Sequence, residues 1–130
     1  MRVAFTSSDG KTVDSHFGMA EQFHVWEIGP ERAEPVGTVS AITRSGDEDD
    51  RIVARASAIA DCVIVYTMEI GGPAAAKLVS RRIHPMKTGA EVAVADLVAK
   101  LQGVLRGKPP PWLRKAMGLP GAVAPPPEAE

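Results

Sequence analysis

The side chain of this sequence best suited to bind a metal is a single histidine in a short loop. His16 lies in the stretch VDSHFGMAEQF, residues 13–23, where Phe17 and Gly18 follow it. Imidazole is a common ligand of iron and other transition metals, and a glycine leaves room for a bulky ligand to approach the backbone. We therefore predict that His16 is a metal ligand in a binding loop that includes Phe17 and Gly18. The alternative is that His16 is an exposed loop residue without a ligand.

A second candidate site is a glycine turn that opens a helix. Gly71 and Gly72 follow the apolar stretch 62–68 and precede Pro73, which suits the first turn of a helix. Free backbone N–H groups at a helix start favour anions, and open α/β sheets bind ligands at the carboxyl ends of their strands. The turn matches neither a Walker A loop nor a dinucleotide fingerprint. The alternative is that the glycines only allow a tight passage from strand to helix.

The charge distribution extends this anion-binding hypothesis toward the C-terminus. Residues 1–76 carry a net charge of −6 and residues 77–118 one of +7, although the whole chain has a net charge of −1. A segment this basic suits nucleic acid, an acidic partner or an anionic ligand, and it is also compatible with a plain solvated surface. The basic candidates that follow the glycine turn are Lys77, Arg81, Arg82 and Lys87, and His84 is a weaker second candidate for binding.

Other reactive side chains offer less. The single cysteine, Cys62, excludes an internal disulfide and a four-thiolate zinc or iron–sulfur site made by this chain alone. It begins the most apolar stretch, which predicts a buried and unreactive thiol. Met19 and Met68 are soft donors, but packing is the commoner role of methionine. The first predicted strand, residues 2–6, has no acidic residue for a two-metal nuclease, so we regard that activity as improbable.

The hydrophobic pattern of the sequence predicts the secondary structure that positions these residues: strands in the first part of the chain, and helices that alternate with strands in the second. Strands come first, at residues 2–6, 22–28 and 32–40. In the second strand Phe23 and Val25 face one side, whereas Ile28 faces the other. Pro35 and Gly37 predict that the third strand lies at a sheet edge.

Helices and strands alternate in the second half of the chain. The expected elements are a helix after a capping box at Ser45–Glu48, a strand at 62–68, a helix at 73–82, a strand at 83–87, and a helix from a second capping box at Thr88–Glu91 to Gly107. The order β-β-β-α-β-α-β-α predicts an α/β fold with a mixed five-stranded sheet and helices packed on it, and it resembles the ribonuclease H-like motif.

The chain divides into three parts on this interpretation. We predict a ribonuclease H-like domain over residues 1–108, a Pro-rich lead with a short helix over 109–117, and a disordered tail over 118–130. No apolar run approaches the length of a membrane span, and the N-terminus lacks the core of a signal peptide. We therefore predict a cytoplasmic protein.

Three stretches of the sequence carry a family resemblance: VAFTSSDGKTVDSHFGMAEQFHVWEI, IGGPAAAKLVSRRIHPMK and GKPPPWLRKAM. They resemble the NifX-type proteins of the dinitrogenase iron–molybdenum cofactor biosynthesis family, and the similarity spans about residues 1–117. The resemblance implies a ribonuclease H-like fold and a carrier protein, not an enzyme. Such a carrier transiently binds iron–sulfur precursors of the nitrogenase cofactor, or the iron–molybdenum cofactor itself, and the resemblance places the candidate ligand His16 in the binding loop.

The resemblance also implies partners. These are the cofactor assembly scaffold and the radical-SAM enzyme that forms the precursor, with neither nucleic acid nor a membrane involved. A carrier of a preassembled anionic cluster needs few protein bonds, which fits a single cysteine beside a glycine turn and basic side chains. The alternative is an interaction or regulatory module that docks on assembly proteins without holding a cluster. Trp112 and the basic C-terminal third would then form the docking surface, unless Trp112 only packs its helix.

Overall fold

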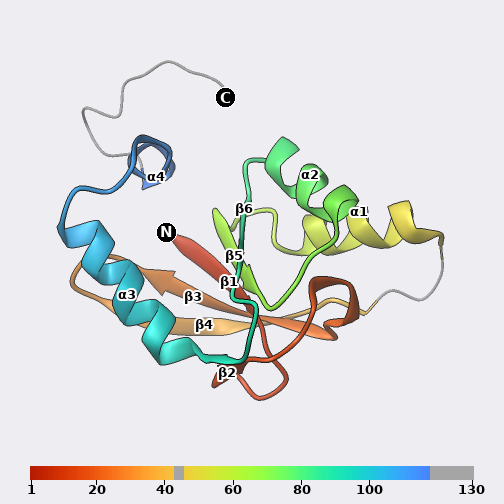
Figure 1. The fold of residues 1–130 in the computed structure, drawn as a ribbon, viewed down its shortest axis with the longest axis horizontal. Helices are drawn as coiled ribbons and strands as arrows, with labels where there is room; N and C mark the ends of the chain where they lie inside the picture. The colour runs from red at the N-terminus through yellow and green to blue at the C-terminus, as the bar shows by residue number, and fades with distance from the viewer. Residues whose placement is uncertain (43–45, 118–130) are drawn as a thin grey trace.

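A mixed sheet of five strands forms the centre of the computed structural model, which describes residues 1–42 and 46–117 (Figure 1). In spatial order the strands are β4-β3-β1-β5-β6. Strands β1 and β5 and strands β5 and β6 pair in parallel, whereas β3 is antiparallel to both of its neighbours. The bounds are β1 Arg2–Thr6, β3 Gln22–Ile28, β4 Ala33–Ser40, β5 Ile64–Thr67 and β6 His84–Lys87. The mixed five-stranded sheet that the sequence predicts is therefore confirmed.

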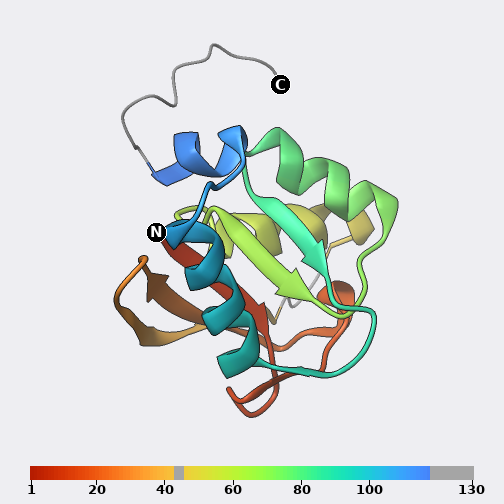
Figure 2. The same ribbon diagram turned by 60° about the vertical axis from the view of Figure 1, so that its left-hand side comes forward.

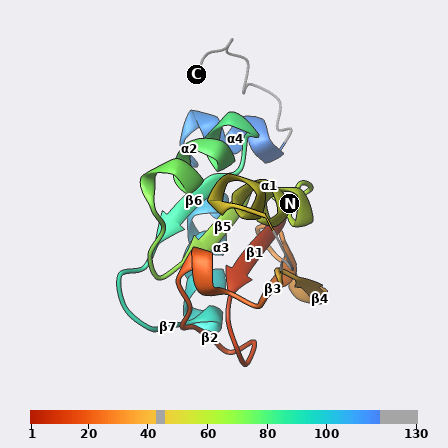
Figure 3. The same cartoon turned by 90° about the vertical axis from the view of Figure 1, so that its right-hand side faces the viewer.

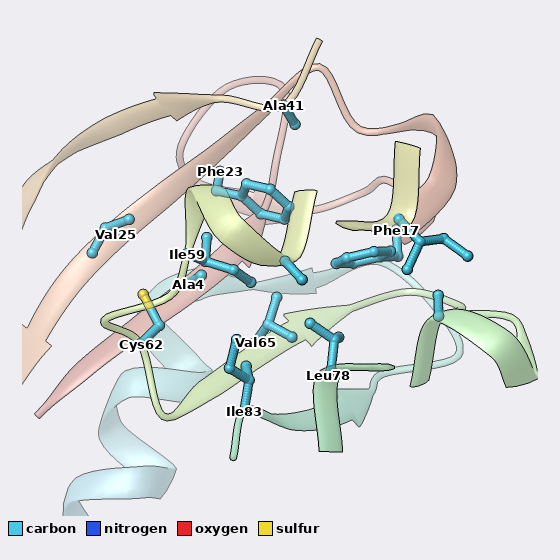
Figure 4. Close-up of a cluster of buried hydrophobic side chains, with 13 residues drawn as sticks. Ala4, Phe17, Phe23, Val25, Ala41, Ile59, Cys62, Val65, Leu78 and Ile83 are labelled. Carbon is cyan, nitrogen blue, oxygen red and sulfur yellow. The ribbon is translucent and has the colours of Figure 1, made fainter. Parts of the chain in front are cut away.

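Helices cover both faces of this sheet (Figures 1 and 2). One face packs against α1 (Glu48–Ala58) and α2 (Gly72–Ser80) in a cluster that includes Phe17 and Cys62 (Figure 4). The other face packs against α3 (Val94–Arg106) and α4 (Pro111–Met117), which is anchored by the buried Leu113. Two separate cores therefore fix the sheet from both sides.

The predicted periodicity of the strands is confirmed. In β3, Phe23 and Val25 belong to the core cluster on the α1 side, and Ile28 belongs to the cluster on the α3 side. All four residues of β5 are buried, as expected of a strand covered on both faces. Strand β4 lies at an edge of the sheet, where Pro35 loses no ladder hydrogen bond on its outer side.

Both predicted capping boxes are wrong. The N-cap of α1 is Asp47, whose carboxylate accepts the Asp50 N–H at 2.9 Å, and Ser45 lies outside the described residues. Helix α3 starts only at Val94, and Thr88 donates its hydroxyl to the Ala90 carbonyl at 2.7 Å instead of capping a helix.

The reason for the late start of α3 is a small second sheet. Strands β2 (Thr12–Val13) and β7 (Val92–Ala93) pair antiparallel, and the Val94 N–H donates to the Lys11 carbonyl at 2.8 Å. This pairing keeps the chain extended up to Ala93, so the helix begins one residue later. Within the described ranges, no helix has both the length and the apolar character of a membrane span. The tail over 118–130 lies outside those ranges.

Candidate functional site

The loop that carries His16 is fixed to the ends of β1 and β5 through one backbone carbonyl. The Ser15 oxygen lies 2.8 Å from Thr6 Oγ1 and 3.1 Å from Thr67 Oγ1, and the Met68 N–H donates to it at 3.1 Å. Both threonines are fully buried. Buried hydroxyl groups need such partners, so these contacts fix the loop to the buried ends of β1 and β5.

Phe17 fixes the next part of the loop from inside. Its N–H donates to the Glu69 carbonyl at 2.9 Å, and its buried ring packs against Phe23 with a centroid separation of 5.8 Å (Figure 4). The short 3-10 turn η1 (Phe17–Met19) is closed by the Met19 N–H, which donates to the His16 carbonyl at 3.0 Å. Phe17 stays a predicted member of the binding loop, and the structure shows that its buried ring anchors the turn from the core side.

The exposed side of this turn faces the start of α2. His16, Gly18 and Met19 line an open cleft of about 400 Å³ together with Glu69, Ile70 and Gly71. Figure 3 shows the orange turn beside the green segment that joins β5 to α2. The two segments that the sequence indicates as candidate sites therefore line one cleft. They meet because β1 and β5 are parallel neighbours, so the loops that leave their carboxyl ends share one edge of the sheet.

The two glycines that line this cleft, Gly18 and Gly71, and the neighbouring Gly72 are required neither by close packing nor by a positive φ. A Cβ atom at Gly18 or Gly72 would meet no atom within 4 Å, and one at Gly71 would meet only Pro73 Cδ at 3.9 Å. None of the three glycines has a positive φ. Gly71 is the N-cap of α2, a position where glycine is itself favoured. Gly18 and Gly72 lie in helical turns, where glycine costs about 0.5–1 kcal/mol relative to alanine. At these two positions neither packing nor a positive φ explains the cost, whereas an open path to the backbone N–H groups does.

One predicted basic residue lies beside the cleft, where it pairs with Glu69 of the cleft wall. Lys87, at the end of β6, lies opposite Thr67, and its Nζ is 3.6 Å from the Glu69 carboxylate. Both side chains are about half exposed, so the ion pair itself stabilises the fold little. Its effect on the cleft is to place a cation beside the carboxylate at the rim.

The other predicted basic residues are not brought to His16. Lys77 lies in the last turn of α2, and Arg81, beyond its end, donates to Ser57 Oγ at 3.1 Å. His84 begins β6 and stacks on Trp112 with a centroid separation of 4.1 Å. Helix α2 runs away from the cleft for nine residues, roughly 13 Å. Strand β6 then returns toward the cleft, so only Lys87 at its far end arrives there.

The remaining member of the predicted basic set, Arg82, has a conformational role. Its φ of 64° is the only positive φ among the non-glycine residues that the structure describes. The following N–H, of Ile83, donates to the Leu78 carbonyl at 2.9 Å, and the Arg82 N–H donates to the Val79 carbonyl at 3.0 Å. This pattern ends α2 in a left-handed residue, which is usually glycine.

Cys62 is a structural residue, as predicted. The residue is 3% exposed, and burial, together with the neighbouring Asp61 carboxylate, raises the pKa of its thiol to about 12. A protonated thiol is a poor metal ligand. In the described part of the chain, no three His, Cys, Asp or Glu side chains are grouped so that they could hold a metal ion. His16 is therefore a single donor and not a member of a ligand cluster.

Two residues of the cleft were missed or misjudged from the sequence. Glu69 has no motif around it, and the only signal for it is that it follows the carboxyl end of the buried strand β5. Met19 was expected to pack, but its side chain is 77% exposed on the cleft wall. Met68 does pack against the core on the α3 side.

The comparison with known proteins can now be set beside this geometry. A family model described as "Dinitrogenase iron-molybdenum cofactor" matches residues 1–103, which include the entire cleft. The chain belongs to this family. The family resemblance that the sequence motifs indicated is therefore confirmed.

Individual relatives agree with this membership. "Protein NifX" of Herbaspirillum seropedicae is 42% identical over 120 residues, which is 90% of this chain and 82% of that protein. "Protein NifY" of Azotobacter vinelandii is 38% identical over 118 residues, and this chain spans about half of its length (48%). A solved structure, "Crystal structure of PH0822", is similar with a TM-score of 0.60 and 26% identity, over 79% of this chain and 91% of that chain.

Proposed function

We propose that this chain carries an iron–sulfur precursor of the nitrogenase iron–molybdenum cofactor, or the cofactor itself, in the cleft at His16. The observation that carries this proposal is the meeting of one exposed imidazole with glycines that neither close packing nor a positive φ requires. Family membership gives the class of cargo, since the family is described by the iron–molybdenum cofactor. The chain would bind and release this cargo unchanged, which is a carrier's role and not an enzyme's.

In this proposal each group of the cleft has a separate task. The His16 imidazole bonds to one iron atom of the preassembled cluster. The backbone N–H groups at Gly71 and Gly72, at the start of α2, donate to sulfide or other anionic ligands of the cluster. Lys87 adds a cation at the rim. One side-chain bond plus hydrogen bonds gives a hold that a recipient protein with several thiolates can outcompete.

The fold supports a more specific class and a division of the chain. If the five strands of the sheet are numbered one to five in chain order, their spatial order is 3-2-1-4-5. Only the second strand, β3, runs antiparallel to the other four. We infer from this order a ribonuclease H-like fold for residues 1–108, with α4 as an added element. The proposed partners are the assembly scaffold and the radical-SAM enzyme that supplies the precursor.

An anaerobic titration with isolated cofactor precursor tests the carrier proposal. We expect His16→Ala to lower the affinity at least about tenfold, the effect of losing one ligand bond worth about 1.4 kcal/mol or more. His84→Gln is the matched control, because it removes an imidazole at the opposite end of β6. Equal binding by wild type and His16→Ala would refute the assignment of the ligand.

A docking module without a cluster is the second candidate. Trp112 favours it, because this large aromatic side chain remains 39% exposed while its helix is anchored by the buried Leu113. Tryptophan and arginine dominate many protein interfaces, and Arg114 and Lys115 lie in the same helix. On this alternative, Trp112→Ala abolishes association with the assembly scaffold while His16→Ala has no effect in a co-purification assay.

A further inference from the structure

Arg55, in α1, is a buried cation with a single hydrogen-bond acceptor among the described residues. It is 8% exposed, and its Nη2 donates to the Ala20 carbonyl at 3.1 Å. Its buried Nε has no partner in the described part of the chain, and no carboxylate in those ranges pairs with the guanidinium. Burial, together with the nearby Arg51, lowers the pKa of Arg55. A buried charge without a counter-ion disfavours folding, so its presence needs an explanation.

The hydrogen bond from Arg55 to the Ala20 carbonyl places the guanidinium behind the wall of the His16 cleft. Ala20 directly follows the turn η1, and Met19 of that turn lines the cleft. Figures 1 and 3 both show the turn next to α1. A ligand in the cleft therefore lies only a few residues of chain from the guanidinium, on the order of 10 Å away.

A purely structural role does not require the charge. A neutral donor such as glutamine also satisfies a backbone carbonyl, without the cost of burying a cation. What a neutral side chain cannot provide is a positive potential that water screens less than it screens the charge of an exposed residue. Across protein interior, a unit charge at about 10 Å changes the affinity for a monovalent ion about tenfold or more at an effective dielectric constant of about 20.

We propose that Arg55 supplies the buried positive charge that makes the His16 cleft favour anionic cargo over cations. The proposal rests on the cleft's proposed function as a cluster carrier and extends it by naming the source of its charge preference. Arg55 also holds the turn from behind through Ala20, so it acts on the ligand both through the turn and through its field, without touching it.

Two probes of opposite charge separate this effect from damage to the turn. The anionic probe is a synthetic thiolate-capped [4Fe–4S] cluster, a dianion that releases one thiolate when the His16 imidazole replaces it on iron. The cationic probe is Ni²⁺, followed by the NMR signals of the His16 ring. The variant is Arg55→Met, which keeps most of the volume and removes the charge. Its matched control is Arg51→Met, which makes the same charge change one turn earlier at an exposed position, where solvent and salt screen it.

We expect Arg55→Met to bind the cluster about tenfold or more weakly at low salt and to bind Ni²⁺ with equal or greater affinity. Arg55→Lys and Arg51→Met should stay within about threefold of the wild type for both probes. If Arg55→Met is insoluble, Arg55→Gln takes its place, since it keeps a donor for the Ala20 carbonyl.

Each outcome decides the proposal. Unchanged cluster binding by Arg55→Met, or an equal loss for Arg51→Met, overturns it. A parallel loss of both probes shows that Arg55 only supports the turn, which also overturns it. If neither the wild type nor His16→Ala binds the cluster, the carrier function fails, and the Ni²⁺ series alone then tests the charge. If both bind it equally, only the assignment of His16 as the ligand fails, and the Arg55 comparison still stands. If His16→Ala weakens cluster binding but Arg55→Met does not, only the assignment to Arg55 fails.

Discussion

Replacing Arg82 by glycine should make this protein more stable, although arginine occupies the end of α2. At a φ of 64°, Arg82 holds a left-handed conformation that costs a residue with a Cβ atom about 1–2 kcal/mol. Glycine removes this cost but has more freedom in the unfolded chain, which takes back about 0.5–1 kcal/mol. The two hydrogen bonds across this position come from backbone groups, so the substitution keeps them.

The net effect of Arg82→Gly is a stabilisation of about 1 kcal/mol, or a rise in Tm of about 4 °C for a domain of this size. Thermal unfolding followed by circular dichroism measures it. Arg82→Ala is the control, because it removes the same charge and keeps the conformational cost, and its Tm should not rise. A Tm for Arg82→Gly at or below that of the wild type would refute the reasoning. Cluster binding should change little in either variant, since Arg82 lies beyond the far end of α2 from His16.

Three other predictions concern the cleft, the Cys62 thiol and the His84 imidazole in β6. Gly18→Val should leave Tm within about 2 °C of the wild type, because a Cβ atom at this position meets no atom within 4 Å. The same substitution should weaken cluster binding at least about tenfold, because the side chain fills the approach to the backbone. Unaltered binding in the same titration would contradict this. Cys62 should resist iodoacetamide in the native protein at pH 8 and react after unfolding. The reason is that a thiol with a pKa of about 12 carries almost no thiolate at this pH. Mass spectrometry measures the labelling, and rapid labelling of the native protein would contradict the prediction. Burial lowers the pKa of His84 in the folded protein below its ordinary 6.5. Below about pH 6.5 the unfolded chain therefore binds more protons at this residue than the folded protein does. Stability should therefore fall with pH from about 6.5 downward, and His84→Phe should flatten this dependence in urea unfolding at several pH values; an unchanged slope would count against the assignment.

Much of the fold was predictable because it depends on local periodicity. The alternation of Phe23 and Val25 with Ile28 assigns the two faces of β3, and the unbroken apolar run around Val65 indicates a strand buried on both sides. These patterns are properties of neighbouring residues, so they survive without any knowledge of the tertiary structure. Helix starts were less predictable. The start of α3 depends on the pairing of β7 with β2, about 80 residues earlier in the chain.

The candidate site was predictable in its parts but not as a whole. The sequence indicated His16 and Gly71 separately, and nothing in the spacing of 55 residues between them shows that they share a cleft. Their meeting depends on the parallel pairing of β1 with β5, which is a long-range contact. The same limitation explains why residues 77–87 were treated as one basic group. Arg81 lies just beyond the end of α2, and strand β6 then separates it from Lys87.

The sequence by itself determined which residues have the chemistry for a soft, anionic cargo and which hydrophobic pattern builds the sheet. Tertiary structure alone decided what surrounds each of those residues. It buried Phe17, exposed Met19 and left Arg55 without a carboxylate partner among the described residues. The physical reason is that residue type and spacing fix local conformation and chemical capacity. Burial, ion pairing and access depend on contacts between elements that are far apart in the chain.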